Sequence, residues 1–195
     1  MARASALAPD ARRALLLTAA RRVFARDGYH GAGVAEIVAE VGVARGTFYR
    51  YFDGKRAIFQ EILATMMDEV LGVVAPIDVT RPIPDQVVAN LERLVRAIAA
   101  EDVCRVLFSE AVGIDEEGDD ALRAFYGDAL ARIERALRTG QNLGVVRAGD
   151  VNVLARCLLG LIKEPVLQSA LDGTELDAGA LAAEIVALLR RGVLG

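Results

Sequence analysis

Residues 31–55 read GAGVAEIVAEVGVARGTFYRYFDGK, and two glycine-containing breaks, at Gly42 and at Asp53-Gly54, divide this stretch. Apolar residues recur at helical spacing between residues 34 and 41, which predicts a short helix there. Gly42 ends this helix because glycine adopts the left-handed conformation readily. A second short helix is predicted over residues 45–52, before a turn at Asp53-Gly54. Two short helices joined by a tight turn are typical of a helix-turn-helix, whose second helix enters the major groove of DNA.

The second predicted helix carries side chains that are suited to reading base pairs. Arg45 and Thr47 lie near its N-terminus, the part of a recognition helix that meets the bases. Arginine can donate two hydrogen bonds to guanine, and the threonine methyl can contact the methyl of thymine. Gly46 between them lets the backbone approach DNA closely. Phe48 and Phe52 are predicted to pack in the core instead.

Side chains that can reach phosphates follow directly along the chain. Tyr49, Arg50 and Tyr51 are predicted to contact the DNA backbone. Lys55 begins the next predicted helix, whose N-terminal amides and dipole also favour anions. These residues would position the protein on DNA, whereas the base-facing residues would select the sequence.

The run from Gly42 to Lys55 resembles the signature of the TetR/AcrR family, which reads near GVSxGTxYxxFxxKxxL. Upstream, AARRVFARDGYHGAGVAEI resembles the first two helices of that family, and the likeness covers about residues 12–63. The resemblance implies that Arg45, Gly46 and Thr47 face bases and that Tyr49, Tyr51 and Lys55 contact phosphates. It also implies an all-α protein with a DNA-binding domain over residues 1–54 and a ligand-binding and dimerisation domain over residues 55–195.

Three residues depart from the family pattern. Gly33 stands where the family usually has Thr or Ser, and Ala44 replaces the usual Ser before the recognition helix. Gly33 can still cap its helix weakly but has no hydroxyl, whereas the cap is lost at Ala44, at a cost of about 1 kcal/mol. Val38 replaces a usual Ala and should shift the packing of the first helices. These departures keep open an alternative function, a helical ligand-binding or interaction module that does not bind specific DNA.

The charge distribution favours DNA binding at one end of the chain. The net charge of the whole chain is −4. Residues 1–60 carry ten Lys and Arg against five Asp and Glu, whereas residues 61–195 carry thirteen against twenty-two. A basic N-terminal region on an acidic remainder suits a protein that presents only that region to phosphates.

The rest of the chain also shows helical periodicity, and we expect about nine helices in total. Apolar residues make up 54% of the chain and aromatic residues 5%, with Ala and Leu prominent, as in an all-α protein. Residues 75–84 contain three prolines and are predicted to be a hinge or loop between subdomains. Asp150 and Asp177 are predicted helix caps, and Pro165 should kink or split its helix. The further helices are predicted over residues 12–26, 55–74, 85–100, 103–112, 120–140, 151–171 and 178–193.

The last two predicted helices are more apolar than a single bundle requires. We therefore expect a homodimer, which would also match the two half-sites of a palindromic operator. The predicted interface residues are Leu154, Leu158, Ile185 and Leu188.

A small-molecule inducer is expected to bind in the middle helices, where the family resemblance implies a pocket. The side chains there are mainly apolar, which indicates a hydrophobic ligand, with an acyl thioester as one candidate. The candidate pocket residues are Met66, Met67, Cys104, Phe108, Phe125, Tyr126 and Leu161.

Catalytic and metal sites are not expected, and neither is a cofactor. His30 is the single histidine, which excludes a multi-histidine metal site. No motif in the sequence supplies a nucleophile with its general base, so we expect no enzyme. Cys104 and Cys157 are predicted to be buried, as in a reduced, cytoplasmic protein.

No apolar run approaches the roughly 18 residues of a membrane span, so we expect no membrane partner. The acidic residues 115–120 are predicted to lie at the N-terminus of the next helix.

Overall fold

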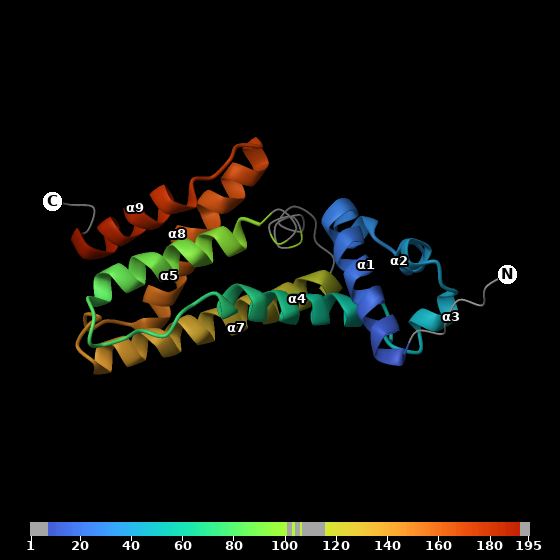
Figure 1. Ribbon diagram of the computed structural model, residues 1–195, viewed down its shortest axis with the longest axis horizontal. Coiled ribbons are helices and arrows are strands. Elements are labelled where there is room, and N and C mark those ends of the chain that lie inside the picture. The colour runs from blue at the N-terminus through green and yellow to red at the C-terminus, as the bar shows by residue number, and fades with distance from the viewer. Residues whose placement is uncertain (1–7, 101–102, 104–105, 107–115, 192–195) are drawn as a thin grey trace. The chain divides into compact units, whose positions relative to one another are not determined.

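The computed structural model describes residues 8–100, 103, 106 and 116–191. These residues form helices and no strand, which confirms the all-α prediction (Figure 1). The predicted helix over residues 103–112 lies mostly outside the described residues, although Val103 and Val106 are helical and buried. The helices are α1 (Pro9–Gly31), α2 (Val34–Val41), α3 (Arg45–Phe48), α4 (Lys55–Gly72), α5 (Ile83–Ile98), α7 (Glu116–Asn142), α8 (Val151–Asp172) and α9 (Ala178–Arg191).

The chain divides into two compact units. The first unit comprises Met1–Thr65 and Arg105–Leu122, and the second unit comprises Met66–Cys104 and Arg123–Gly195. The first unit thus continues beyond residue 54, where the sequence placed the domain boundary, and takes in more than half of α4. The reason is that Phe59 on α4 packs into the core of the first unit.

Three aromatic rings form the centre of this core. The ring of Phe59 lies 5.0 Å from that of Phe24 and 4.6 Å from that of Tyr29, measured between centroids. All three side chains are buried. Gly28, with φ of 70°, kinks α1 just before Tyr29 and lets the chain change direction there. The helical backbone is therefore interrupted at Gly28, two residues after the end predicted at residue 26, and a short helical segment follows to Gly31.

Charged side chains fasten the helices of the first unit to one another. Arg13 on α1 donates two hydrogen bonds to the carboxylate of Glu61 on α4. Its guanidinium also lies 4.8 Å from the ring centroid of Phe52. On the other side of α1, Glu40 of α2 lies 3.7 Å from Arg22 and 3.5 Å from Arg26.

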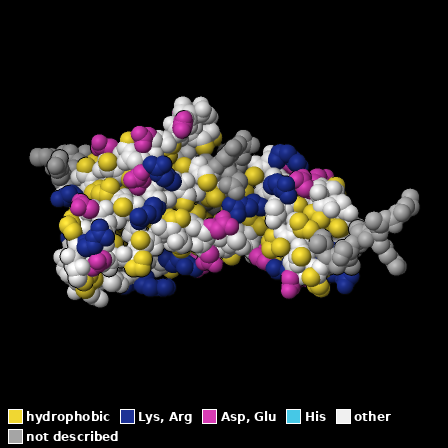
Figure 2. All heavy atoms as spheres, viewed as in Figure 1, with side chains coloured by type: hydrophobic (Ala, Val, Ile, Leu, Met, Phe, Trp, Pro, Cys, Tyr) yellow, Lys and Arg dark blue, Asp and Glu magenta, His cyan; other side chains and the backbone are white. Residues whose placement is uncertain are grey.

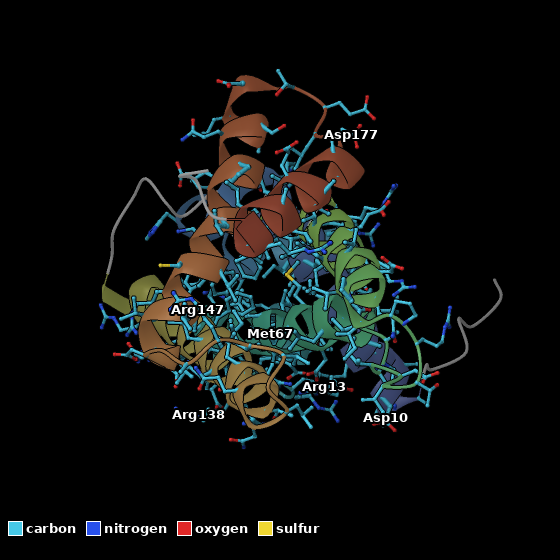
Figure 3. All side chains as sticks on the ribbon, turned by 90° about the vertical axis from the view of Figure 1, so that its left-hand side faces the viewer. Asp10, Arg13, Met67, Arg138, Arg147 and Asp177 are labelled. Atoms are coloured by element: carbon cyan, nitrogen blue, oxygen red, sulfur yellow. The ribbon has the colours of Figure 1, made fainter. Side chains whose placement is uncertain are left out.

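The second unit is a helical bundle in which α5 packs against α8 and α9. Asp150 and Asp177 cap α8 and α9 as predicted, and Figure 3 shows Asp177 in the loop before α9. Pro165 does not split its helix, because α8 runs through it from Val151 to Asp172. None of the helices that the structure describes has the length and apolar character needed to cross a membrane.

One buried side chain holds the loop between α4 and α5 in place. The Asn90 amide accepts a hydrogen bond from the Ala75 backbone N–H and donates one to the Ala75 carbonyl, both at 2.9 Å. The proline-containing segment that the sequence predicted as a loop is therefore tied to the middle of α5.

Candidate DNA-binding site

Helices α2 and α3 form the predicted helix-turn-helix. Gly42 ends α2 in the left-handed conformation, with φ of 73°, and the Val43 N–H donates to the Val38 carbonyl at 3.0 Å. Helix α3 is shorter than predicted and ends at Phe48 rather than at residue 52. Turns continue from it, in which the Phe48 carbonyl accepts hydrogen bonds from the N–H groups of Tyr51 and Phe52.

The base-facing residues predicted from the sequence lie on α3. Arg45 and Gly46 are exposed, and Thr47 is half-buried. Phe48 and Phe52 are buried, as predicted, and their rings lie 5.6 Å apart. Buried Phe48 anchors the C-terminal end of α3, and buried Phe52 anchors the turn that follows it.

The predicted phosphate contacts occupy two kinds of environment. Tyr49 and Arg50 are exposed, whereas Tyr51 and Lys55 are half-buried. The Lys55 ammonium donates a hydrogen bond to the Tyr29 carbonyl at 2.8 Å and lies 4.2 Å from the centroid of the Tyr29 ring. This tie between the start of α4 and the end of α1 was not predicted, because the two residues are distant in sequence.

The unusual residues at the helix starts leave both α2 and α3 without a side-chain cap. The N-cap residues are Gly33 for α2 and Ala44 for α3, and neither residue has a side-chain oxygen that could accept a capping hydrogen bond. At Gly33 the space of a side chain is taken by Glu36, because a Cβ there would lie 2.5 Å from the carboxylate oxygen of Glu36. A carboxylate in the first turn of a helix interacts favourably with the helix dipole. Glu36 therefore stands in for part of what a capping hydroxyl would supply.

The single histidine lies at the surface of the first unit. His30 is exposed, and its ring meets that of Tyr29 edge to face at 5.6 Å. Within the part of the chain that the structure describes, no three His, Cys, Asp or Glu side chains are grouped to hold a metal ion.

The candidate ligand residues that the structure describes lie in the second unit. Met66 and Met67 are buried, and Phe125, Tyr126 and Leu161 are half-buried. Cys104 and Phe108 lie outside the described residues. The pocket itself stays a prediction.

Tyr126 has a basic neighbour that the sequence did not reveal. The Lys163 ammonium on α8 lies 5.0 Å from the centroid of the Tyr126 ring on α7. Burial raises the pKa of the Tyr126 hydroxyl to about 12, so this group stays protonated at neutral pH. It can therefore act as a hydrogen-bond donor within the bundle.

The second unit also contains a cleft that the sequence did not predict. Its volume is about 770 Å³, within the usual range for small-molecule sites. None of the predicted pocket residues that the structure describes lines it. It is lined by residues from the end of α5, the end of α8 and the loop into α9: Arg96, Ala99, Ala100, Val166, Ser169, Ala170, Thr174, Glu175, Leu176, Asp177 and Ala178.

The predicted interface residues differ in exposure. Leu154 and Leu158 are half-buried, and Leu188 is 37% exposed. Ile185 is only 2% exposed because it already packs within its own chain. Apolar side chains reach the surface of this unit among charged ones (Figure 2). Further exposed apolar residues of α8 and α9 are Val153, Leu171 and Leu189.

Cys157 corrects a prediction, because it is exposed rather than buried. It lies on α8 one turn after Val153, which is itself 55% exposed. The apolar periodicity of α8 is therefore shared between an inward and an outward face, and Cys157 belongs to the outward one.

Comparison with known proteins places the chain in a family. Residues 16–62 match the family model of bacterial regulatory proteins, tetR family. The HTH-type transcriptional regulator YdgC of Bacillus subtilis is 30% identical over 189 residues, which cover 92% of this chain and 91% of that protein. Both the family model and this relative describe transcriptional regulators rather than enzymes, in line with the sequence expectation.

Solved structures share the fold at lower identity. The regulator FadR of Bacillus subtilis, determined in complex with stearoyl-CoA, matches with a TM-score of 0.76 and 22% identity over 92% of this chain and 98% of that one. AibR, determined in complex with isovaleryl coenzyme A and operator DNA, matches with a TM-score of 0.66 and 20% identity over 91% and 97%. With its helix-turn-helix and a relative of matching length, this chain belongs to the TetR family of bacterial transcriptional regulators.

Proposed function

We propose that the protein is a cytoplasmic, ligand-responsive repressor that binds a palindromic operator as a homodimer. The observation that carries this proposal is α3, which presents Arg45, Gly46 and Thr47 on a backbone anchored by buried Phe48. Arginine and threonine at the start of a recognition helix suit direct reading of base edges in the major groove. A mainly hydrophobic small molecule would release the protein from DNA.

DNA binding is tested with the promoter upstream of the protein's own gene. In an electrophoretic shift assay we expect a complex that survives an excess of unrelated DNA, at a protein concentration where a scrambled fragment stays free. Equal binding to both fragments at all salt concentrations would instead support a helical module without specific DNA binding.

Replacing Arg45 or Thr47 with alanine is expected to relax discrimination at one or two base pairs of each half-site. Each change should cost about 1–3 kcal/mol for the preferred base, because a direct contact to that base is lost. Dissociation constants measured on operators with single base-pair changes would check this. If either variant lost affinity to the same extent on all operators, the base-facing role of that residue would be contradicted.

Replacing Lys55 with alanine is expected to weaken binding similarly on every operator variant. Loss of one phosphate contact should also reduce the slope of log affinity against log salt concentration by about 1. The Lys55 contact with Tyr29 makes a thermal melt an essential companion measurement. A lower melting temperature with an unchanged salt slope would show that Lys55 serves only the fold.

Dimerisation is supported by the outward faces of α8 and α9. Leu171 is 64% exposed on α8, and Leu188 is partly exposed on α9. Together with the other exposed apolar residues of these helices they form a surface that a second copy can cover. Pairing of α8 and α9 with their counterparts would build a four-helix interface.

The ligand is proposed to be an acyl thioester, with its acyl chain among the apolar side chains of the second unit. Two proteins of the same fold were determined with acyl-coenzyme A molecules. In this chain Lys163 pairs with no carboxylate among the described residues, so its ammonium is available to an anionic group. The protonated Tyr126 hydroxyl beside it can donate a hydrogen bond to the same group.

Acyl-coenzyme A thioesters of increasing chain length are the probes for this proposal. We expect thermal stabilisation and release of fluorescent operator DNA at the same concentrations, because the ligand must favour the state that does not bind DNA. Free coenzyme A is the control for the nucleotide part alone. Stabilisation without release of DNA would contradict ligand-gated repression by these compounds.

A further inference from the structure

Three side chains around α3 make a continuous series from the core to the surface. Phe48 is fully buried, and the Tyr49 ring meets it edge to face at 5.4 Å with an interplanar angle of 82°. The Arg45 guanidinium carbon lies 5.9 Å from the centroid of the Tyr49 ring. The Arg45 Nη2 is also 3.4 Å from the Tyr49 hydroxyl.

The position of Arg45 depends on this ring. An arginine at a helix surface has many rotamers, and fixing one of them costs entropy. Among the described residues, no carboxylate pairs with Arg45, and Gly46 beside it has no side chain. A guanidinium within about 6 Å of an aromatic centroid is attracted by the ring quadrupole. The Tyr49 ring is in turn fixed by its contact with Phe48.

We propose that Tyr49 is a positioning residue that holds Arg45 in place to read its base pair. The inference rests on the proposed base-facing role of Arg45. It assigns two separate tasks to one side chain: the ring of Tyr49 orients the guanidinium, and the hydroxyl remains able to contact phosphate. Tyr49 thereby contributes to sequence discrimination without touching a base.

The test compares Tyr49→Leu, which removes the ring, with Tyr49→Phe, which keeps it. The affinity of each variant is measured on a set of operators, each of which carries one base-pair substitution. Arg45→Ala first identifies the base pair that Arg45 reads, through a loss of discrimination of about 5- to 150-fold. Tyr49→Leu should lose about two- to fivefold discrimination at that same base pair. Tyr49→Phe should keep discrimination and lower affinity evenly. The double variant Arg45→Ala/Tyr49→Leu should discriminate no worse than Arg45→Ala.

The outcomes separate the inference from the proposed function. If Tyr49→Leu weakens all operators evenly while Arg45→Ala loses discrimination, the base-reading role stands and the positioning role is refuted. If Arg45→Ala loses discrimination nowhere, both fail. A loss for Tyr49→Leu at a different base pair would also overturn the inference, because Tyr49 would then read DNA itself.

Tyr49 is 48% exposed, so the variants should fold. A thermal melt of each checks this, and Tyr49→Met serves as the ring-free variant if Tyr49→Leu is unstable.

Discussion

Replacing Leu188 with glutamate is expected to convert the protein into monomers and to lower operator affinity by about 10²- to 10⁴-fold. The new carboxylate would have to be buried at an apolar interface, which is costly unless it is paired. A monomer reaches only one half-site and loses the gain from binding two sites at once. Sedimentation equilibrium and fluorescence anisotropy on the same samples measure both effects.

The matched control for this variant is Leu143→Glu. Leu143 is 63% exposed and lies in the turn after α7, outside the surface formed by α8 and α9. This variant should stay dimeric and keep its operator affinity. Sedimentation of the unmodified protein as a monomer at micromolar concentration would refute the proposed dimer.

Replacing Phe59 with alanine is expected to reduce the free energy of unfolding of the first unit by about 3–5 kcal/mol. Its ring contacts both Phe24 and Tyr29 and has almost no exposed surface, so its removal leaves a cavity in the aromatic core. DNA binding should be lost with the fold, because α3 belongs to the same unit as this core. Urea denaturation followed by Tyr fluorescence measures the change.

Phe59→Leu is the corresponding control, since leucine refills most of the space and should cost clearly less. If Phe59→Ala destabilised the protein by less than about 1 kcal/mol, the packing of Phe59 in the aromatic core would not be what holds the first unit together.

Apolar periodicity was sufficient to predict most of the helices. Leu16, Phe24 and Ile37 are buried as their spacing required, and α2 has the predicted bounds. The prediction failed for α3, where the helical pattern continues to Phe52 but the helix ends at Phe48. A run of turns can also bury Phe52, so spacing alone could not distinguish it from a second turn of helix.

Contacts between distant elements could not be predicted in this way. The ties of Lys55 to Tyr29, of Lys163 to Tyr126 and of Arg13 to Glu61 each join residues that are at least 26 positions apart. They depend on how the helices pack, which local patterns do not encode. The exposure of Cys157 could not be predicted for the same reason. Local periodicity identifies an apolar helix face, but helix packing decides whether that face is buried or exposed.

The hydrogen bond from Lys55 to the Tyr29 carbonyl has a consequence for the thermodynamics of DNA association. Immobilising a free surface lysine costs as much as about 2 kcal/mol, because the side chain loses conformational entropy. Because Lys55 is already hydrogen-bonded to Tyr29, part of this entropy is lost on folding, before DNA binds. Its ammonium has three protons and uses one for Tyr29, so two remain for phosphate oxygens. Binding of DNA to Lys55 therefore starts from an ordered side chain, and the further loss of side-chain entropy at this residue is small.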